Sequence, residues 1–167
     1  MRERQAAQGA RRAREFEAFV AGAAGRLLHT ATLLTAEAPG ANPHARRLLT
    51  RALAHTYACW DRLRGEDPYN HARRQVAARF AREAWHQRGG SGRARRRPPG
   101  ALAALTAQER LIIVLRLYEG VAEEQAAALM GLPTDRVRVI CDRAITTLTR
   151  TPVNPAPAVG DTEAAPS

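Results

Sequence analysis

The segment AEEQAAALMGLPTDRVRVICDRAITTLTR (residues Ala122–Arg150) decides the fold of the C-terminal part of this chain. Its first part, up to Leu129, is predicted to be a short helix, and Gly131 stands where a tight turn needs a residue that tolerates positive φ. Pro133 is well placed to start a second helix. Five residues of that second helix recur at spacings of three and four and form one apolar face, namely Val137, Cys141, Ala144, Ile145 and Leu148.

Three arginines of the second predicted helix, Arg136, Arg138 and Arg143, fall outside this apolar face. A helix of small residues, a glycine turn and a second helix with a basic outer side are typical of a helix-turn-helix that reads DNA. An ordinary helical hairpin in a small all-α domain is the alternative that this segment alone leaves open.

The overall charge favours a polyanionic partner. The chain carries a formal net charge of +10 and has a sequence pI of about 11.3. Its length of 167 residues suits one modest domain or two small ones. All 26 residues counted as Lys or Arg are Arg. This preference, together with abundant Ala, points to a GC-rich genome as much as to guanidinium chemistry. The charge is therefore evidence for nucleic acid, whereas the choice of Arg over Lys is not.

The cysteines and histidines predict neither a metal nor another cofactor. Cys59 and Cys141 have no CxxC partner and no adjacent histidine at ligand spacing, so they are interpreted as buried thiols of a cytosolic protein. The five histidines also form no short metal-binding pair; they are His29, His44, His55, His71 and His86.

The sequence also argues against an enzyme and against a membrane protein. It shows no Ser/His/Asp set, paired carboxylates or Gly-rich phosphate loop, and Glu123 and Glu124 are interpreted as surface charges. No apolar run approaches the roughly 20 residues that span a bilayer. The basic start lacks the apolar stretch of a secretory signal, which indicates a cytoplasmic protein without membrane insertion.

Composition and periodicity divide the chain into an all-α arrangement of two small helical domains. Residues 1–14 form a basic arm, either disordered or the fraying start of a helix, and the Pro/Ala-rich residues 151–167 are predicted to be a disordered tail. Between them lie a helical domain over 15–88, a flexible basic linker, GGSGRARRRPPG, over 89–100, and a helical domain over 101–150. In the first domain, helices are expected from Glu15 up to a break at 36–43, over about 44–63, and from Pro68 to about Arg88.

Two short patterns mark helix starts. Asp67 before Pro68 is typical of an N-cap followed by proline at the first helical position. Thr106, with Glu109 three residues later, predicts a capping box.

The helix from Pro68 also predicts a stacking residue. At ~100° per residue, Val76 and Phe80 share one stripe with Ala72 and Ala84, and Trp85 points nearly opposite. An aromatic ring among guanidinium groups is typical of surfaces that stack unpaired bases. Packing of Trp85 against a neighbouring helix is the alternative. The arginines that share its side are Arg74, Arg82 and Arg88.

Two parts of the sequence, in this order, resemble the extracytoplasmic-function (ECF) sigma factors of bacterial RNA polymerase, and the Ala/Arg richness resembles their actinobacterial members. EFEAFV (15–20), RLLHTATLLT (26–35) and ALAHTYACWDRLRGEDPYNHARRQV (52–76) are similar to sigma domain 2, a three-helix bundle. Residues 101–150 carry the L-R-x-Y-E-G, A-x-x-M-G and R-A elements of the helix-turn-helix sigma domain 4 at the family's spacing. The resemblance covers about three quarters of the chain.

This resemblance implies a non-enzymatic transcription initiation factor that binds core RNA polymerase and promoter DNA, with an anti-sigma factor as an open further partner. In the family, domain 2 docks on the polymerase and melts the −10 element, and domain 4 reads the −35 element. The residues carried over to the −10 strand are Arg74, Arg82, Trp85 and Arg88. Those carried over to the −35 element are Thr134, Asp135, Arg136, Arg138 and Arg143.

Two departures from the family's pattern indicate that the resemblance is to a divergent form. Where the family usually has an acidic A-E-D-L-V-Q-E helix facing the polymerase, this chain has ARRLLTR (45–51). Like charges should repel the same surface, at a cost of a few kcal/mol if they are desolvated. The residues expected at this polymerase-binding position are Arg46, Arg47, Leu49 and Arg51.

The second departure lies in the recognition helix, where the family's G-T-V-K-S-R is replaced by DRVRVI (135–140). Val139 and Ile140 take the place of groups that usually meet DNA, and Asp135 should repel phosphate. These changes leave a second hypothesis open. In it, the chain is a degenerate sigma-like regulator that binds proteins through exposed Val139 and Ile140 and the face of Arg46 and Arg47, without full sigma activity.

Overall fold

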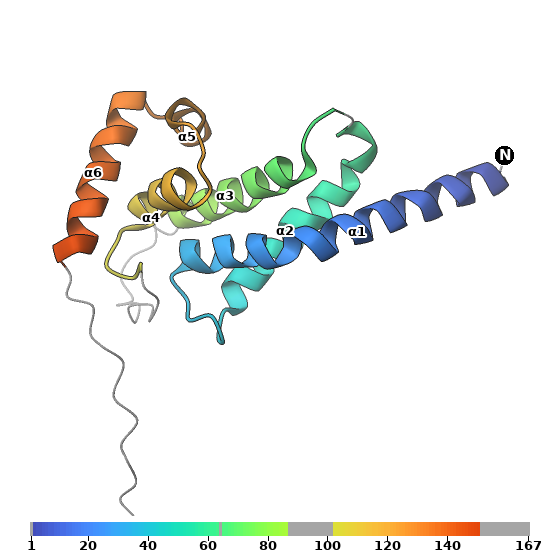
Figure 1. Cartoon of the computed structure of the whole chain (residues 1–167), viewed down its shortest axis with the longest axis horizontal. Coiled ribbons are helices and arrows are strands. Elements are labelled where there is room, and N and C mark those ends of the chain that lie inside the picture. Colours follow the sequence, from blue (N-terminus) through green and yellow to red (C-terminus); the bar gives the residue numbers. More distant parts are fainter. Residues whose placement is uncertain (1, 64, 87–101, 151–167) are drawn as a thin grey trace, which may run out of the picture.

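The computed structural model describes residues 2–63, 65–86 and 102–150, and these parts of the chain are all-α, as predicted (Figure 1). No strand occurs in the described ranges; one isolated bridge joins Ala38 and Ala41. The elements are α1 (Arg2–Thr35), α2 (Pro43–Ala58), the 3₁₀-helix η1 (Trp60–Arg62), α3 (Pro68–His86), α4 (Ala107–Ile113), the π-helical turn η3 (Val114–Tyr118), α5 (Glu123–Met130) and α6 (Thr134–Arg150).

Helix α1 begins at Arg2, much earlier than the expected start at Glu15. Residues 2–14 are mostly Arg, Gln, Glu and Ala, which are strong helix formers, and they continue the helix outward beyond α2 (Figure 1). Arg12 fixes this extension, because its guanidinium donates to the Tyr57 carbonyl at 2.5 Å and lies 4.3 Å from the centroid of the Tyr57 ring. Of the two expectations for the basic arm, the start of a helix is therefore the one the structure shows.

Helix α2 ends at Ala58, five residues before the expected end. The backbone N–H of Cys59 is shared between the carbonyls of His55 and Thr56, at 3.1 and 3.2 Å. This sharing tightens the last turn, and the chain continues as η1. The first break is as expected: α1 ends at Thr35 and α2 begins at Pro43.

Both predicted helix starts are confirmed. The Asp67 carboxylate accepts a hydrogen bond from the Tyr69 N–H at 3.0 Å, and Pro68 is the first residue of α3. Thr106 and Glu109 form a capping box in which each side chain accepts from the other residue's backbone N–H. These local bonds satisfy N–H groups that have no partner inside the helix.

Helices α1, α2 and α3 pack against one another. The stripe predicted for α3 faces inward, since Ala72, Val76 and Phe80 are all buried. Against them lie Leu27 and Leu34 of α1, both fully buried. Burial of each large apolar side chain contributes roughly 1.5–3 kcal/mol, which makes this stripe the main support of the three-helix unit.

The helical pair α5–α6 is joined by the turn that the sequence predicts. Gly131 ends α5 in the left-handed region with φ of +64°, where other residues would be strained. The N–H of Leu132 then donates to the carbonyl of Ala127 at 3.0 Å, which closes the end of the helix.

The two helical units share one hydrophobic core. A single cluster of buried residues runs from α1, α2 and α3 into α4, η3, α5 and α6. Arg110 of α4 crosses the boundary, because its Nε donates to the Leu34 carbonyl at 2.8 Å while its Nη1 donates to Leu105 of its own unit at 2.7 Å. The proposed linker and tail, 89–100 and 151–167, lie outside the described residues, and the division into two domains stays a prediction.

A buried carboxylate lies at the same boundary. The side chain of Glu119, just after η3, is completely buried and accepts a short hydrogen bond from the Thr30 hydroxyl and bonds of 2.9 and 3.0 Å from the Tyr69 hydroxyl. Arg26 and Arg73 lie 3.3 and 3.7 Å from the same carboxylate. Burial and the bond to Glu119 raise the pKa of Tyr69, so the phenol stays protonated and keeps donating.

Candidate nucleic-acid interface

Helix α6 has one buried side and one solvent-facing side that carries the predicted arginines. Arg136 and Arg138 are both exposed, as expected from their place on the helix. Arg138 is engaged within the motif, because its Nη2 lies 2.8 Å from a Glu123 oxygen and its Nη1 lies 3.5 Å from Asp135. Exposed ion pairs of this kind are worth little, so a phosphate can replace these carboxylates as the partner of Arg138.

Arg143 extends the basic side toward the C-terminal end of α6. Its side chain is 77% exposed, and its Nε lies 3.4 Å from the carboxylate of Glu109. It also lines an open groove of about 520 Å³ together with Thr146, Thr147 and Arg150. Thr146, Thr147 and Arg150 were not predicted from the sequence, although the seven-residue spacing of Arg143 and Arg150 places both on one side of a helix.

Asp135, predicted to repel phosphate, lies in the first turn of α6 and is 93% exposed. A carboxylate at this position interacts favourably with the positive end of the helix dipole. Thr134, the first residue of α6, is half-buried. Asp135 therefore has a structural use at the start of the helix.

Two expectations for the apolar residues of α6 are wrong. Ile140, expected to be exposed, is buried, whereas Ile145, assigned to the apolar face, is 38% exposed. The buried residues of α6 are Val137, Ile140 and Ala144. At 3.6 residues per turn these three positions lie closer together on one side of the helix than Val137 and Ile145 do. Val139 is 58% exposed, as expected, so only this part of the proposed protein-binding pair faces solvent.

The predicted stacking residue lies at the edge between α3 and α4. Trp85 is 37% exposed and lines a narrow pocket together with Phe80 of α3 and Leu111 of α4. Arg82 is exposed, and Arg74 is exposed with a short bond to Glu66. Trp85 thus has one packed side and one open side, while Arg88 lies outside the described residues.

The residues expected to meet the polymerase divide between surface and core. Arg46, Arg47 and Arg51 are exposed on α2. Arg51 lies 3.4 Å from Glu83 of α3, and this ion pair ties the two helices together. Leu49 instead is buried between α1 and α3, so it supports the bundle and offers no surface to a partner.

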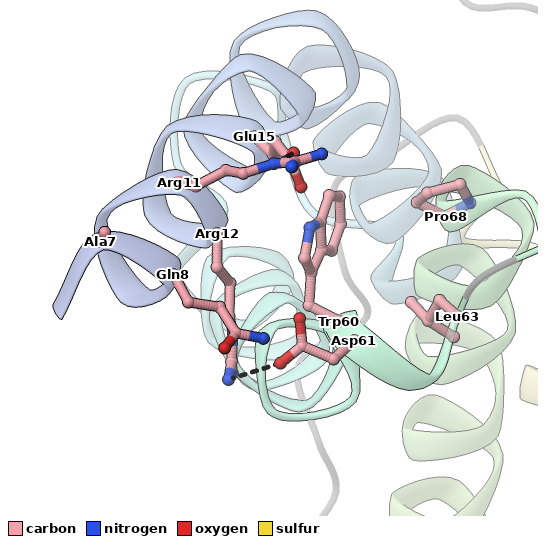
Figure 2. A pocket seen from close by; sticks show the side chains of 9 residues that line it. All are labelled: Ala7, Gln8, Arg11, Arg12, Glu15, Trp60, Asp61, Leu63 and Pro68. Carbon is pink, nitrogen blue, oxygen red and sulfur yellow. Dashed lines mark hydrogen bonds and ion pairs between the residues drawn. The ribbon is translucent and has the colours of Figure 1, made fainter. Parts of the chain in front are cut away.

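A larger groove of about 780 Å³ runs between the start of α1 and η1 (Figure 2). Its charged side chains are paired with one another: Arg11 lies 2.7 Å from Glu15, and Arg12 lies 3.3 Å from Asp61. Among the residues that line it, none forms a nucleophile–base pair. The groove therefore offers shape without an arrangement for catalysis.

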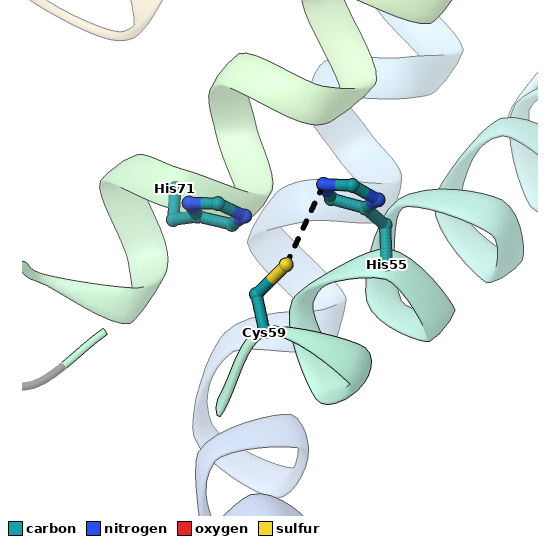
Figure 3. Close-up of side chains that lie close together, drawn as sticks. All are labelled: His55, Cys59 and His71. Atoms are coloured by element: carbon teal, nitrogen blue, oxygen red, sulfur yellow. Dashed lines mark hydrogen bonds between the residues drawn. The ribbon is translucent and has the colours of Figure 1, made fainter. Parts of the chain in front are cut away.

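Sequence reasoning missed one grouping, which involves three of the side chains that it had set aside. His55, Cys59 and His71 come together between α2 and α3, with ligand-type atoms all within 4.8 Å of one another (Figure 3). The four-residue spacing of His55 and Cys59 was a usable signal, because it places both side chains on one side of a helix. The contribution of His71 depends on the packing of α3 against α2.

None of the helices in the described part of the chain combines the length and the apolar character needed to cross a membrane.

Comparison with known proteins gives two findings. Residues 101–150 match the family model of sigma-70 region 4. The fold is similar to that of the sigma factor RpoE from Bartonella quintana, solved in complex with the anti-sigma factor NepR. The likeness covers 81% of this chain and 94% of that chain, with 20% sequence identity and a TM-score of 0.59, and it is a likeness of fold. No curated protein sequence matches the chain.

Proposed function

We propose that this chain is a DNA-binding transcription initiation factor of the ECF sigma type, which directs bacterial core RNA polymerase to promoters without being an enzyme itself. The observation that carries the proposal is the match of residues 101–150 to sigma-70 region 4, combined with the helix-turn-helix that α5 and α6 form there. The likeness of fold to RpoE extends the support to the N-terminal helices.

In this proposal α6 reads the −35 element. Arg136 and Arg138 face solvent on its first half, where base edges of a major groove would be reached, and Arg143 follows toward the backbone phosphates. Thr134 and Asp135, at the start of the helix, lie at the groove in this proposal, and the charge of Asp135 disfavours a phosphate beside it. The net charge of +10 supplies long-range attraction to DNA.

The N-terminal unit melts the −10 element in the same proposal. The open side of Trp85 stacks on an unpaired base, and Arg74, Arg82 and Arg88 neutralise nearby phosphates. The exposed Arg46, Arg47 and Arg51 of α2 form the surface toward the polymerase, so we expect a polymerase contact with unusual charge preference. Such a factor acts in the cytoplasm.

The test is a pull-down of the full chain with purified bacterial core polymerase, followed by run-off transcription on genomic fragments. Core binding with start-site-specific transcripts is the expected result. The matched control is an Arg136→Ala/Arg138→Ala double variant, which should keep core binding and lose start-site selection. A chain that binds a protein partner but yields no transcript with core would instead support the sigma-like regulator, and exposed Val139 is the observation that favours this second candidate.

A further inference from the structure

His55, Cys59 and His71 form a cluster of metal-ligand types in the N-terminal helical unit. His55 lies in the last turn of α2, Cys59 directly follows that helix, and His71 lies in the first turn of α3. The Sγ of Cys59 is 3.8 Å from Nε2 of His55, and all three ligand atoms lie within 4.8 Å of one another. Figure 3 shows one ring nitrogen of His71 pointing toward the other two side chains.

The state of His71 is unusual for a buried polar group. The residue is 8% exposed, and neither of its ring nitrogens has a hydrogen-bond partner among the described residues. Buried polar side chains are normally satisfied, and an exception calls for an explanation such as an ion.

We propose that His55, Cys59 and His71 bind a divalent transition-metal ion of the Zn²⁺ class. One thiolate and two imidazole nitrogens are the donor set that zinc prefers, and a water or carboxylate completes the four positions.

The distances fit this ion after a small contraction. With bonds of about 2.3 Å to sulfur and 2.0 Å to nitrogen, a tetrahedral zinc holds two nitrogens roughly 3.3 Å apart and a nitrogen and a sulfur roughly 3.5 Å apart. The 3.8 Å between Cys59 Sγ and His55 Nε2 is within a few tenths of an ångström of this, whereas the limit of 4.8 Å for the whole group requires closure by an ångström or more. The rings of His55 and His71 are stacked at 3° with centroids 5.7 Å apart, so both must turn to aim their nitrogens at one point.

A carboxylate is placed to support the site. Nδ1 of His71 lies 3.8 Å from an oxygen of Glu66, which leaves Nε2 as the ligand nitrogen. Metal-binding histidines usually donate their other N–H to a carboxylate, and a slight closure of this distance would form that bond. Two guanidinium groups stand nearby, since Arg62 lies 3.9 Å from the Cys59 sulfur and Arg74 is bonded to Glu66.

Binding would link the end of α2 to the start of α3. The bridge would close the short connection that contains η1, and it would lie next to Arg74, which the proposed function assigns to the −10 strand. Because the site comes from residues of one folded unit, it needs neither DNA nor polymerase. Its test is therefore independent of the proposed function.

The test uses the full chain, purified under reducing conditions without a polyhistidine tag, and titrated with Co²⁺ and then with Zn²⁺. We expect one Co²⁺ per chain with the charge-transfer absorption of a thiolate ligand, displaced stoichiometrically by Zn²⁺. Cys59→Ser should abolish this absorption. The matched control is Cys141→Ser, which changes the chain's other cysteine and should leave both the absorption and the stoichiometry intact.

Two further variants keep the proposal falsifiable if a ligand change disturbs folding. Glu66→Gln, a change on the surface, should leave the stoichiometry intact and weaken Zn²⁺ binding by roughly 10–100-fold. His55→Ala should remove binding while circular dichroism stays helical. Absence of thiolate absorption in the unchanged chain, or equal Zn²⁺ binding in the unchanged chain and in Cys59→Ser, would overturn the proposal.

Discussion

Glu37 makes the start of α2 sensitive to acid. Its carboxylate accepts hydrogen bonds from the backbone N–H groups of His44 and Ala45, at 3.1 and 2.8 Å, and from the Thr35 hydroxyl at 3.0 Å. Burial acts to raise the pKa of Glu37, but these bonds outweigh it, and the net result is a pKa below the ordinary 4.5. Because the folded-state pKa is lowered, the carboxylate stabilises the fold above the unfolded-state value, and this stabilisation is lost as the pH falls through the folded-state value.

Glu37→Gln should therefore lower the free energy of unfolding by about 1 kcal/mol at pH 7, as for loss of a helix cap. Urea unfolding at a series of pH values should show the difference between variant and unchanged chain shrinking below pH 4.5. Glu17→Gln, an exposed carboxylate of α1, is the control and should change stability little. A difference that stays constant down to pH 3 would show that Glu37 does not cap α2.

Substitution of Trp85 can show whether its side chain stacks on a DNA base or packs within the fold. Aromatic–base stacking is worth roughly 1–3 kcal/mol, so Trp85→Ala should weaken binding to single-stranded −10 DNA by about 5- to 150-fold, measured by fluorescence anisotropy. Phe80→Ala is the contrast, because this ring is buried and its loss should cost ~3–5 kcal/mol of stability instead. If Trp85→Ala lowers the melting temperature as much as Phe80→Ala and leaves single-strand binding intact, Trp85 is a packing residue.

At the scale of elements, helix starts and turns could be predicted because their signals are local. The Asp67 cap, the capping box at Thr106 and the left-handed Gly131 all depend on residues within four positions. For the basic arm the sequence left two expectations, and the choice of a helix depends on Arg12 reaching Tyr57 across to α2. The early end of α2 was not predicted, because nothing in the residue types near Cys59 signals that its N–H is shared between two carbonyls.

The candidate site shows the same limit. The exposed arginines of α6 follow from helical periodicity, but the choice between Ile140 and Ile145 as core residue depends on how α6 rotates against its neighbours. His71 joins His55 and Cys59 only through the packing of α3 on α2. A contact between elements is set by tertiary structure, and sequence spacing within one element carries no information about it.

A further prediction concerns Arg138 of α6, for which Glu123 and DNA would compete as partners. Arg138 is 2.8 Å from Glu123, so in the proposed function DNA would displace this carboxylate. Arg138→Ala should weaken binding to duplex −35 DNA by ~1–3 kcal/mol if it removes the proposed base contact. Loss of a phosphate contact would instead reduce the salt slope by about 0.9. Glu123→Gln should have the opposite sign and strengthen binding, because it frees Arg138; Glu124→Gln, an exposed neighbour, is the control. Anisotropy titrations at several salt concentrations measure both effects, and unchanged affinity in all variants would remove this face from the interface.

At the scale of the whole molecule, the shared core bears on the proposed function. In that proposal one unit reads the −10 element and the other reads the −35 element, whereas the shared core holds the two units against each other. The proposed function therefore predicts that the packed units separate when both elements are bound, and that they part at the buried boundary.

Glu119 is the residue at which this separation can be tested. Its carboxylate joins Thr30 and Tyr69 across the boundary, and removing one member of a buried charged network typically costs about 3–5 kcal/mol. Glu119→Gln should lower the cooperativity and midpoint of urea unfolding and increase the radius of gyration measured by small-angle X-ray scattering. Glu124→Gln, on the exposed side of α5, controls for the loss of a charge. If the packed state limits promoter recognition, Glu119→Gln should also increase the initial rate of transcript formation with core polymerase. A larger radius together with a slower rate would mean that the packed boundary supports transcription, because the units would then have to stay together for the complex to form.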